Sequence, residues 1–403
     1  MRVKHKVAWG SVGIVGTVRR LVLLVSAIVL VDTMLYAALV PLLPHYADEF
    51  GLGKAGSGLL VAAYAAGALL GALPGGFAAA RFGPRRAVLT GLAAMTVASI
   101  AFGFAGDAVT LGITRLLQGA GSALSWAGAL AWLVAGTPRE RRGEMMGTAI
   151  GSAIFGALLG PAIGAAAERL GPRPVFLGVA GVAALLGIWA LRTPPAEAQP
   201  QSLRAVGRAV RQPIILGALW LMVLPALLFG VVAVLIPLEL DRHGWSAAAI
   251  AAVFIGSAAI EMFVAPLLGR LSDRRGRLGP VRAALVAAIC VTTALAVANE
   301  PAAIVVLVVA AAIAFGAFWA PAMALLSDGA ERIGLAQGLG FGLMNAAWGA
   351  GNSAGPSLGG SLADAAGDAL PFAFMAAVCA VTLTVLTRRV SFGTRTVRVP
   401  ESP

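Results

Sequence analysis

Three ionisable residues lie deep within long apolar stretches of this 403-residue sequence: Asp32, Arg115 and Glu261. A charge near the middle of a lipid bilayer costs about 3 kcal/mol or more, so such residues are functional candidates by default. An apolar environment disfavours the ionised form of a carboxylic acid, which makes Asp32 and Glu261 candidates for reversible proton binding. We hypothesise that at least one of these carboxyl groups couples proton movement to another event.

Each of these residues also has a structural interpretation. Asp32 and Glu261 could be buried acids that bond to neighbouring helices without exchanging protons. Arg115 could pack locally or extend its long side chain to the membrane surface. We favour a substrate or proton role for Asp32, which shares a helix face with Tyr36 one turn later. For Glu261 and Arg115 both interpretations stay open.

The sequence contains no pattern typical of catalysis or of metal binding. His5, His45 and His243 lie outside the apolar stretches, whereas Cys290 and Cys379 lie inside them. No paired His or Cys spacing occurs, so we expect no enzyme active site, no metal, no disulfide and no cofactor.

Polar and aromatic side chains recur at helical spacing in two apolar stretches, as they would on the wall of a cavity. The first stripe is Gln118, Ser122 and Trp126, and the second is Phe341, Asn345, Trp348 and Asn352. Aromatic stripes more often serve packing, but an amide facing lipid would be costly. For the second stripe, binding and packing are therefore equally supported.

The stretches that position these residues belong to a membrane protein. The chain is 59% hydrophobic and 12% charged, with a mean hydropathy of +0.89, whereas soluble domains carry about 25% charge. Stretches of around 20 apolar residues can each cross a bilayer. Twelve are predicted, near 21–44, 56–80, 87–106, 108–135, 145–167, 175–191, 213–239, 247–269, 281–298, 301–326, 335–361 and 370–387.

The chain is internally duplicated. Residues 40–42 (VPL) return as 236–238 (IPL), and the basic turn at 76–86 returns at 269–278. A glycine-proline signature at 156–164 returns at 351–360. Recurrence at a nearly constant offset predicts a transporter built from structural repeats. We therefore divide the chain into a six-helix bundle (1–191), a linker (192–212) and a second six-helix bundle with a tail (213–403).

The basic residues are distributed unevenly between the predicted loops. Of 30 Lys and Arg residues, 25 fall in the termini and one set of alternate loops, and Arg115 lies within a span. The opposite loops hold only Lys54, Arg169, Arg173 and Arg242. Because Lys and Arg accumulate in cytoplasmic loops, both termini are predicted to be cytoplasmic. The net charge of +12 then indicates topology and contact with anionic lipids rather than nucleic acid binding.

The linker between the halves predicts a short surface helix. It is rich in proline and polar residues, and Arg204, Arg208 and Arg211 fall on one helical face. Such a basic amphipathic helix is expected to lie on the inner membrane surface.

These motifs resemble those of the major facilitator superfamily over nearly the whole chain, above all the twelve-span drug:proton antiporters and vesicular monoamine transporters. The loop signature G-x-x-x-D-R-x-G-R-R is intact at 269–277 (GRLSDRRGR), whereas 76–86 (GFAAARFGPRR) has Ala80 in place of the acid. The fourth-span pattern R-x-x-Q-G-x-G matches 115–121, and the antiport pattern G-x-x-x-G-P-x-x-G matches 156–164.

The resemblance implies roles for particular residues. Asp32 matches the amine-binding acid of the first span, but the position of a second such acid holds Asn345, which cannot titrate. Ala80 leaves the charge relay of the first-half cytoplasmic gate incomplete. The prolines are interpreted as gate-forming bends, although tight packing is the alternative. The residues assigned to gating are Gly76, Arg81, Gly83, Arg85, Gly156, Gly160, Pro161, Gly164, Gly269, Asp273, Arg274, Gly276, Arg277, Gly355 and Pro356.

The sequence thus predicts an all-α polytopic membrane protein with the major facilitator fold, with twelve spans in two pseudo-symmetric six-helix bundles. Its expected function is proton-coupled export of a small amphipathic, neutral or cationic compound. A proton-coupled importer of a nutrient or metabolite and a non-transporting sensor or scaffold are the alternatives. Heavy Ala, Gly and Arg usage suggests a bacterial cytoplasmic membrane, and the resemblance implies a monomer.

Overall fold

The computed structural model describes residues 10–138, 141–196, 203–275, 278–333 and 337–393, and within these ranges every regular element is a helix. The first half contains α1 (Gly10–Ala37), the short 3-10 helix η1 (Val40–Leu42), α2 (Leu43–Glu49), α3 (Lys54–Phe82), α4 (Pro84–Gly103), α5 (Ala108–Gly136), α6 (Arg142–Leu170) and α7 (Pro172–Leu191). The second contains α9 (Pro213–Arg242), α10 (Ala247–Arg275), α11 (Leu278–Leu295), α12 (Pro301–Gly316), α13 (Trp319–Arg332), α14 (Gln337–Ala366) and α15 (Ala369–Gly393). The seven-residue helix α8 (Leu203–Ala209) lies in the linker.

Twelve helical segments of the described chain are long enough to cross a membrane, if α12 and α13 are taken as one broken span. Ten of them also satisfy a hydropathy criterion for membrane spans. The other two, α5 and α14, are long enough but fall below this hydropathy criterion. The prediction of an all-helical, multi-pass membrane protein is confirmed.

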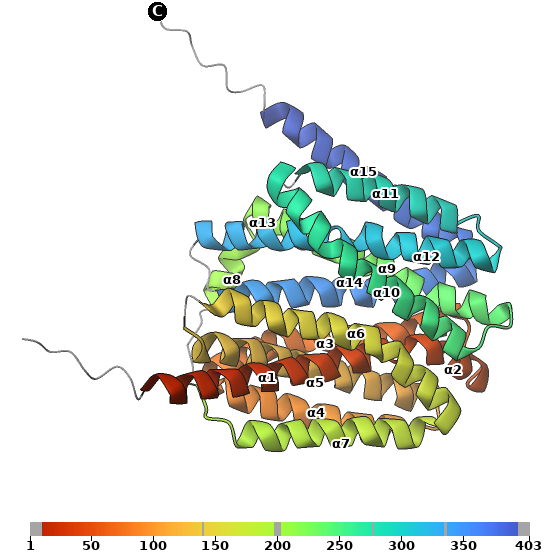
Figure 1. Ribbon diagram of the computed structural model, residues 1–403. Helices are drawn as coiled ribbons and strands as arrows, with labels where there is room; N and C mark the ends of the chain where they lie inside the picture. The colour runs from red at the N-terminus through yellow and green to blue at the C-terminus, as the bar shows by residue number, and fades with distance from the viewer. Residues whose placement is uncertain (1–9, 139–140, 197–202, 276–277, 334–336, 394–403) are drawn as a thin grey trace, which may run out of the picture.

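The helices form two groups that lie side by side (Figure 1). Helices α1 to α7 form one group and α9 to α15 the other, with α8 at one end of the molecule. The two groups meet where α3 packs along α14 and where α6 packs along α10. Helix α3 also packs along α5, so it contacts both of the helices that fall below the hydropathy criterion.

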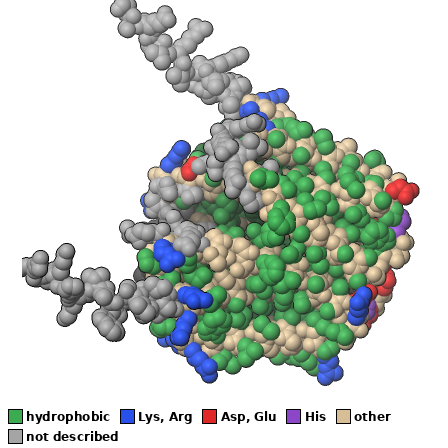
Figure 2. Space-filling model, in the orientation of Figure 1, with side chains coloured by type: hydrophobic (Ala, Val, Ile, Leu, Met, Phe, Trp, Pro, Cys, Tyr) green, Lys and Arg blue, Asp and Glu red, His purple; other side chains and the backbone are tan. Residues whose placement is uncertain are grey.

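The charged side chains gather at the two ends of the helices (Figure 2). Blue Lys and Arg side chains cluster at the end that holds α8, which we call the basic end. Most acidic side chains on this face lie at the opposite end, which we call the far end, and hydrophobic side chains cover the middle. This belt is what a lipid-facing surface requires.

Each glycine-proline signature packs a helix directly onto the backbone of a neighbour. In the first half a Cβ on Gly156 or Gly160 would collide with the carbonyl of Leu30 or Met34 in α1. In the second half a Cβ on Gly355 would collide with the carbonyl of Leu227 in α9. The pairs α1–α6 and α9–α14 are equivalent under the duplication. The structure therefore shows the close-packing role of these signatures, and their action as a gate stays a prediction.

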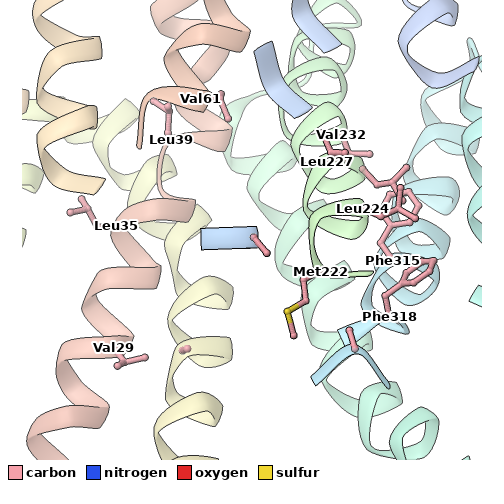
Figure 3. Close-up of a cluster of buried hydrophobic side chains, with 14 of the residues drawn as sticks. Val29, Leu35, Leu39, Val61, Met222, Leu224, Leu227, Val232, Phe315 and Phe318 are labelled. Atoms are coloured by element: carbon pink, nitrogen blue, oxygen red, sulfur yellow. The ribbon is translucent and has the colours of Figure 1, made fainter. Parts of the chain in front are cut away.

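Buried aliphatic and aromatic side chains fill the interior of both groups (Figure 3). On one side Val29, Leu35 and Leu39 belong to the α1 region, and on the other Leu224 of α9 packs near Phe315 of α12. These apolar cores surround a small polar cluster in the first half.

Candidate functional site

Asp32 is the centre of that polar cluster. Its side chain lies in α1 and is only 3% exposed. The indole Nε1 of Trp126 in α5 donates a hydrogen bond of 2.6 Å to one carboxyl oxygen, and the Tyr64 hydroxyl of α3 donates one of 3.0 Å to the other. Two donors on separate helices thus hold the carboxyl group, which is how a protein stabilises a buried carboxylate.

Glycines allow α3 and α5 to approach closely enough for both donors to reach Asp32. A Cβ on Gly67 of α3 would collide with the Leu116 carbonyl, and one on Gly119 of α5 would collide with the Tyr64 carbonyl. Gly119 belongs to the R-x-x-Q-G-x-G motif. Part of the motif's role is therefore to set the spacing of the two helices that carry Tyr64 and Trp126.

Arg115 is buried rather than extended to the membrane surface, with 1% of its area exposed. One terminal nitrogen donates hydrogen bonds of 3.1 Å to the Leu35 carbonyl and to Gln118 Oε1. The other donates one of 3.1 Å to the Tyr36 carbonyl. Leu35 and Tyr36 are among the last three residues of α1, where carbonyls lack helical donors. Arg115 therefore caps the end of the helix that carries Asp32.

Tyr64 links the arginine to the acid. The Arg115 guanidinium lies 4.7 Å from the centroid of the Tyr64 ring, whose hydroxyl bonds to Asp32. No carboxylate of the described residues forms an ion pair with Arg115. Asp32, which accepts a hydrogen bond from the hydroxyl of the same tyrosine, is the acid of this cluster, so Tyr64 contacts both of the opposite charges.

Tyr36 connects the cluster to the second half. Its hydroxyl donates a hydrogen bond of 2.7 Å to Oδ1 of Asn352 in α14. The centroid of its ring lies 5.3 Å from the centroid of the Tyr64 ring. It lies 5.0 Å from the centroid of the Trp348 ring, which it meets edge to face. Trp348 and Asn352 were both predicted as cavity residues, and the structure places them against Tyr36.

The remaining residues of the two predicted stripes have different surroundings. Ser122 lies beside the Asp32 carboxyl. Gln118 is fully buried between Arg115 and Ser99, to whose hydroxyl it donates a hydrogen bond of 3.2 Å. Asn345 is half-buried in α14, and the Phe341 side chain lies outside the described residues.

Glu261 lies apart from the Asp32 cluster. It is a half-buried residue of α10, and its carboxyl packs against Gly316 at the end of α12. A Cβ at Gly316 would occupy the position of this carboxyl group. The span then breaks between α12 and α13. Glu261 is thus placed beside the break rather than beside Asp32.

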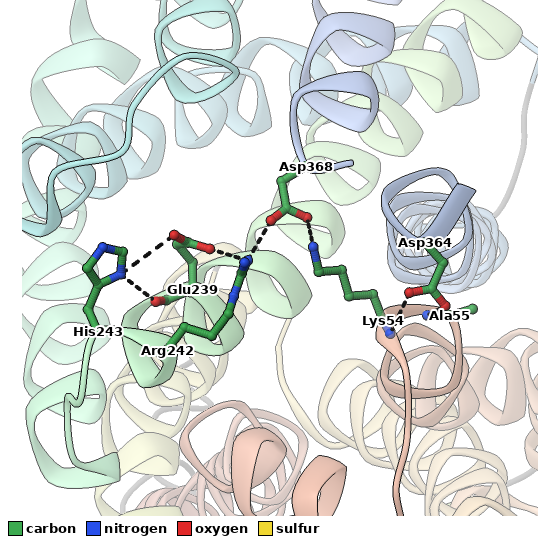
Figure 4. A network of polar contacts seen from close by, with 7 residues as sticks. All are labelled: Lys54, Ala55, Glu239, Arg242, His243, Asp364 and Asp368. Atoms are coloured by element: carbon green, nitrogen blue, oxygen red, sulfur yellow. Dashed lines mark hydrogen bonds and ion pairs between the residues drawn. The ribbon is translucent and has the colours of Figure 1, made fainter. Parts of the chain in front are cut away.

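A polar network ties the two halves together at the far end (Figure 4). The Lys54 ammonium of α3 pairs with Asp368, which also accepts a bond of 2.6 Å from Arg242. Arg242 pairs in turn with Glu239 in the same helix. Asp364 accepts bonds of 2.9 Å from the backbone N–H groups of Lys54 and Ala55. We call these residues, with His243, the far-end network.

Backbone contacts reinforce this closure. A Cβ on Gly58 of α3 would collide with the Pro356 carbonyl of α14, and one on Gly360 would collide with the Lys54 carbonyl. Pro356, assigned to gating, thus lies in the contact between the halves. The far end is shut by direct helix packing as well as by charge pairs.

The loop motifs are only partly described. Gly83 has a positive φ of 92° between α3 and α4, which favours glycine. It lines a cavity of about 500 Å³ at the basic end with Phe82, Arg85, Arg86, Leu89, Pro195 and Ala196. Gly76 is half-buried and Arg81 is exposed. In the second copy, the side chains of Gly269, Asp273 and Arg274, and the whole of Gly276 and Arg277, lie outside the described residues.

Sequence reasoning missed Tyr64, Lys54, Asp364 and Asp368. Tyr64 is one of three tyrosines and sits in an alanine- and glycine-rich helix, where a polar aromatic residue is a usable signal. Lys54 is one of only four basic residues in the loops opposite the basic set. That rarity was the available signal that Lys54 has a partner in the other half.

Comparisons with known proteins agree with this architecture. A family model described as Major Facilitator Superfamily matches residues 25–341. The MFS-type transporter ppzB of Metarhizium rileyi (strain RCEF 4871) is 32% identical over 122 residues, which are 29% of this chain and 25% of that protein. The chain therefore spans about a quarter of the curated relative that it matches.

Solved transporter structures share the fold over most of the chain. A bacterial homologue of the human lysosomal transporter Spinster, inward-facing and unoccupied, has a TM-score of 0.70 and 16% identity, and the match covers 93% of this chain and 96% of that one. The xylose transporter XylE from E. coli, partially occluded and inward open, has a TM-score of 0.74 and 15% identity, with 93% and 98% covered. A D-xylose-proton symporter has a TM-score of 0.69 and 17% identity, with 91% and 97% covered.

Proposed function

The chain belongs to the major facilitator superfamily, and from this starting point we propose that it exports a small amphipathic, neutral or cationic compound in exchange for protons. Family and fold make it a multi-pass secondary transporter and not an enzyme. Direction, substrate class and ion are our proposal, with both six-helix bundles rocking about the central site as in other transporters built from repeats.

The observation that supports proton exchange is the pair of donors on the buried Asp32 carboxyl. In its ionised form the carboxylate accepts hydrogen bonds from Tyr64 and Trp126 and attracts a cationic substrate. A bound proton removes the charge and with it the attraction. Because proton and substrate compete for one group, loading of one releases the other, which is the thermodynamic basis of exchange.

Protonation of Asp32 also changes the charge balance of the whole cluster. Arg115 keeps its charge at any physiological pH, and it is buried within the same cluster. A proton on Asp32 therefore leaves the arginine without a compensating anion, and an uncompensated buried charge is strongly unfavourable. A conformation that admits water or a new partner to the cluster is favoured in response.

The basic end supports a proposal for the orientation of the protein. We place that end, both termini and α8 at the cytoplasmic face of a bacterial cell membrane, where anionic lipids would meet the arginines. The far-end network is then an outer gate, and it is closed in this structure. We assign Glu261 as a second candidate coupling acid and expect the protein to act as a monomer.

The experiment uses everted membrane vesicles that hold an acid-inside gradient. Proton efflux is recorded as lipophilic cations, amines and neutral antibiotics are added to vesicles that contain the parent protein, Asp32→Asn or Asp48→Asn. Asp48 is an exposed acid near the far end and serves as the matched control. We expect substrate-triggered efflux in the parent and in Asp48→Asn, and its loss in Asp32→Asn.

Other outcomes distinguish the alternatives. Equal efflux from all three proteins would remove Asp32 from the mechanism. Silence with correctly inserted protein would favour the alternative of proton-coupled import, and a D-xylose-proton symporter shares the fold. Uptake of sugars and other metabolites into right-side-out vesicles would then be measured.

A further inference from the structure

A chain of side chains runs from the Asp32 carboxyl to the second half. Tyr64 bonds to Asp32, the Tyr64 and Tyr36 rings lie 5.3 Å apart, and the Tyr36 hydroxyl bonds to Asn352. The far-end network lies at the helix ends, so within the described spans the Tyr36–Asn352 contact is the side-chain hydrogen bond that joins the two halves. Asn352 is fixed by its own bond of 3.3 Å to the Trp348 carbonyl.

We propose that Tyr64 and Tyr36 are positioning residues for transport. Tyr64 orients the Asp32 carboxylate, and Tyr36 conveys the state of that carboxylate to the second half through Asn352. This inference rests on the proposed function, because it needs Asp32 to exchange its proton. It adds the route by which that exchange reaches the contact between the halves.

The bond strengths support this route. Hydrogen bonds to an ionised carboxylate are about twice as strong as neutral ones, so a proton on Asp32 weakens the hold on the Tyr64 hydroxyl and the Trp126 indole. Tyr64 is 1% exposed, and its ring contacts both the Arg115 guanidinium and the Tyr36 ring. In so tightly packed a site, movement of Tyr64 displaces Tyr36.

Arg115 links the responses of the two tyrosines. It bonds to the Leu35 and Tyr36 carbonyls while it stacks on Tyr64. The backbone of Tyr36 and the ring of Tyr64 are therefore held by a single guanidinium. When its attraction to Asp32 weakens, both tyrosines are released together rather than one at a time.

The surroundings of Asp32 contain no competing acid among the described residues. The titratable or charged side chains that face it are Tyr64 from α3 and Arg115 from α5. Helix α6 approaches α1 through glycines, and α14 contributes Asn352 and Trp348 to Tyr36. A pH response of this cluster is thus assigned to Asp32 itself.

The chain supplies a matched control for each tyrosine. It has three tyrosines in all, and the third, Tyr46, is 3% exposed and packs against Phe50 and Phe102. In the described structure its hydroxyl makes no hydrogen bond. Tyr46→Phe therefore removes a buried hydroxyl outside the route, whereas Tyr36→Phe and Tyr64→Phe remove hydroxyls within it.

The test measures the far end directly and needs no known substrate. Full-length protein with Cys290 and Cys379 replaced by serine receives spin labels at Gly106→Cys and Asn299→Cys, exposed positions at the far ends of the two halves. Pulsed electron resonance then gives the fraction with long label separation at acidic and alkaline pH. We expect acid to increase this open fraction in the parent and in Tyr46→Phe.

Tyr64→Phe should reduce the acid response, and Tyr36→Phe should raise the open fraction about threefold to tenfold at both pH values, since one hydrogen bond between the halves is lost. Asn352→Ala removes the acceptor from the other side and should reproduce Tyr36→Phe. It also provides a second variant if either tyrosine variant fails to fold.

The outcomes separate the two proposals. If the parent shows no response to acid, proton coupling at Asp32, and with it the proposed function, is contradicted. If the parent responds and the variants of Tyr36, Tyr64 and Asn352 respond as Tyr46→Phe does, the route is wrong while the proposed function stands.

Discussion

Asp364 of the second half caps a helix of the first half by accepting the backbone N–H of Lys54. The same carboxylate accepts the N–H of Ala55, and a Cβ at Gly53 would lie 3.0 Å from its Oδ2. A helix cap is ordinarily a local feature that stabilises its own segment. Here the cap exists only while the far end is closed. The free energy by which it stabilises α3 therefore also stabilises the closed gate.

Replacing Asp364 with alanine should therefore open the far end. A lost cap costs about 1 kcal/mol, which corresponds to a roughly fivefold larger open fraction in the spin-label measurement. Asp107→Ala is the control, because Asp107 caps α5 within one half through the Thr110 N–H. An equal effect of both variants on label separation would show that the Asp364 cap does not close the gate.

The Asp107 cap should itself weaken in acid. Hydrogen bonds from the Thr110 hydroxyl and backbone N–H lower the pKa of Asp107 below its ordinary value. A carboxyl with a lowered folded-state pKa stabilises the fold above its unfolded-state pKa of about 4 and loses this contribution as the pH falls through the folded-state value. Amide exchange at residues 108–112, corrected for intrinsic rates, should accelerate in that acidic window. In Asp107→Asn this acceleration should be absent.

Arg115→Lys should destabilise the protein although the charge is kept. A lysine ammonium cannot reproduce the fork that reaches the Leu35 and Tyr36 carbonyls and Gln118 together. Unsatisfied buried acceptors cost about 1–3 kcal/mol each, so we expect a clearly lower melting temperature by intrinsic tryptophan fluorescence. Arg173→Lys is the matched control, because that arginine stacks on Phe104 at an exposed position. Equal melting temperatures of the parent and Arg115→Lys would show that the Arg115 hydrogen bonds do not stabilise the end of α1.

Gly160→Ala should reduce both stability and transport. The new methyl group would collide with Ala37 and the Met34 carbonyl of α1, and overpacking of this kind costs about 1–3 kcal/mol. Gly151→Ala on the same helix meets no atom within 4 Å and should be neutral or slightly stabilising. Melting temperature and the rate of proton exchange check both variants. Unimpaired transport by Gly160→Ala would contradict a gating role for this signature.

Gly316→Ala should reproduce the effect of Glu261→Gln. The added Cβ takes the place of the Glu261 carboxyl, so the acid must leave its position beside the α12–α13 break. If Glu261 is a coupling acid, both variants flatten the pH dependence of transport in the same way. Gly256→Ala, in open space five residues before Glu261 on α10, should leave that dependence unchanged. A normal pH profile in Glu261→Gln would assign the acid a structural role.

Much of the fold could be predicted from the sequence, because the lengths of the apolar stretches and the repeated motifs can both be read from the linear sequence. The sequence predicts both the span that holds Asp32 and the stripe that holds Trp126, but not the contact between them. The direction of Arg115 could not be predicted, since a long side chain can reach either the membrane surface or a helix end. The far-end network also escaped prediction, because Lys54 and Asp364 are 310 residues apart and no local pattern joins them.

The low mean hydropathy of α5 and α14, two helices that pack along α3, has a consequence for how the protein is made. Neither helix reaches the hydropathy criterion that the ten other spans satisfy, so an insertion machinery that admits segments by their hydrophobicity has less reason to release these two into lipid. Helix α5 follows soon after its partner α3, but α14 is synthesised near the end of the chain and finds the same partner in the other half. Folding in the membrane is therefore expected to be complete only when α14, the eleventh span, packs against α3, the second span. Neither half then completes its folding before the other.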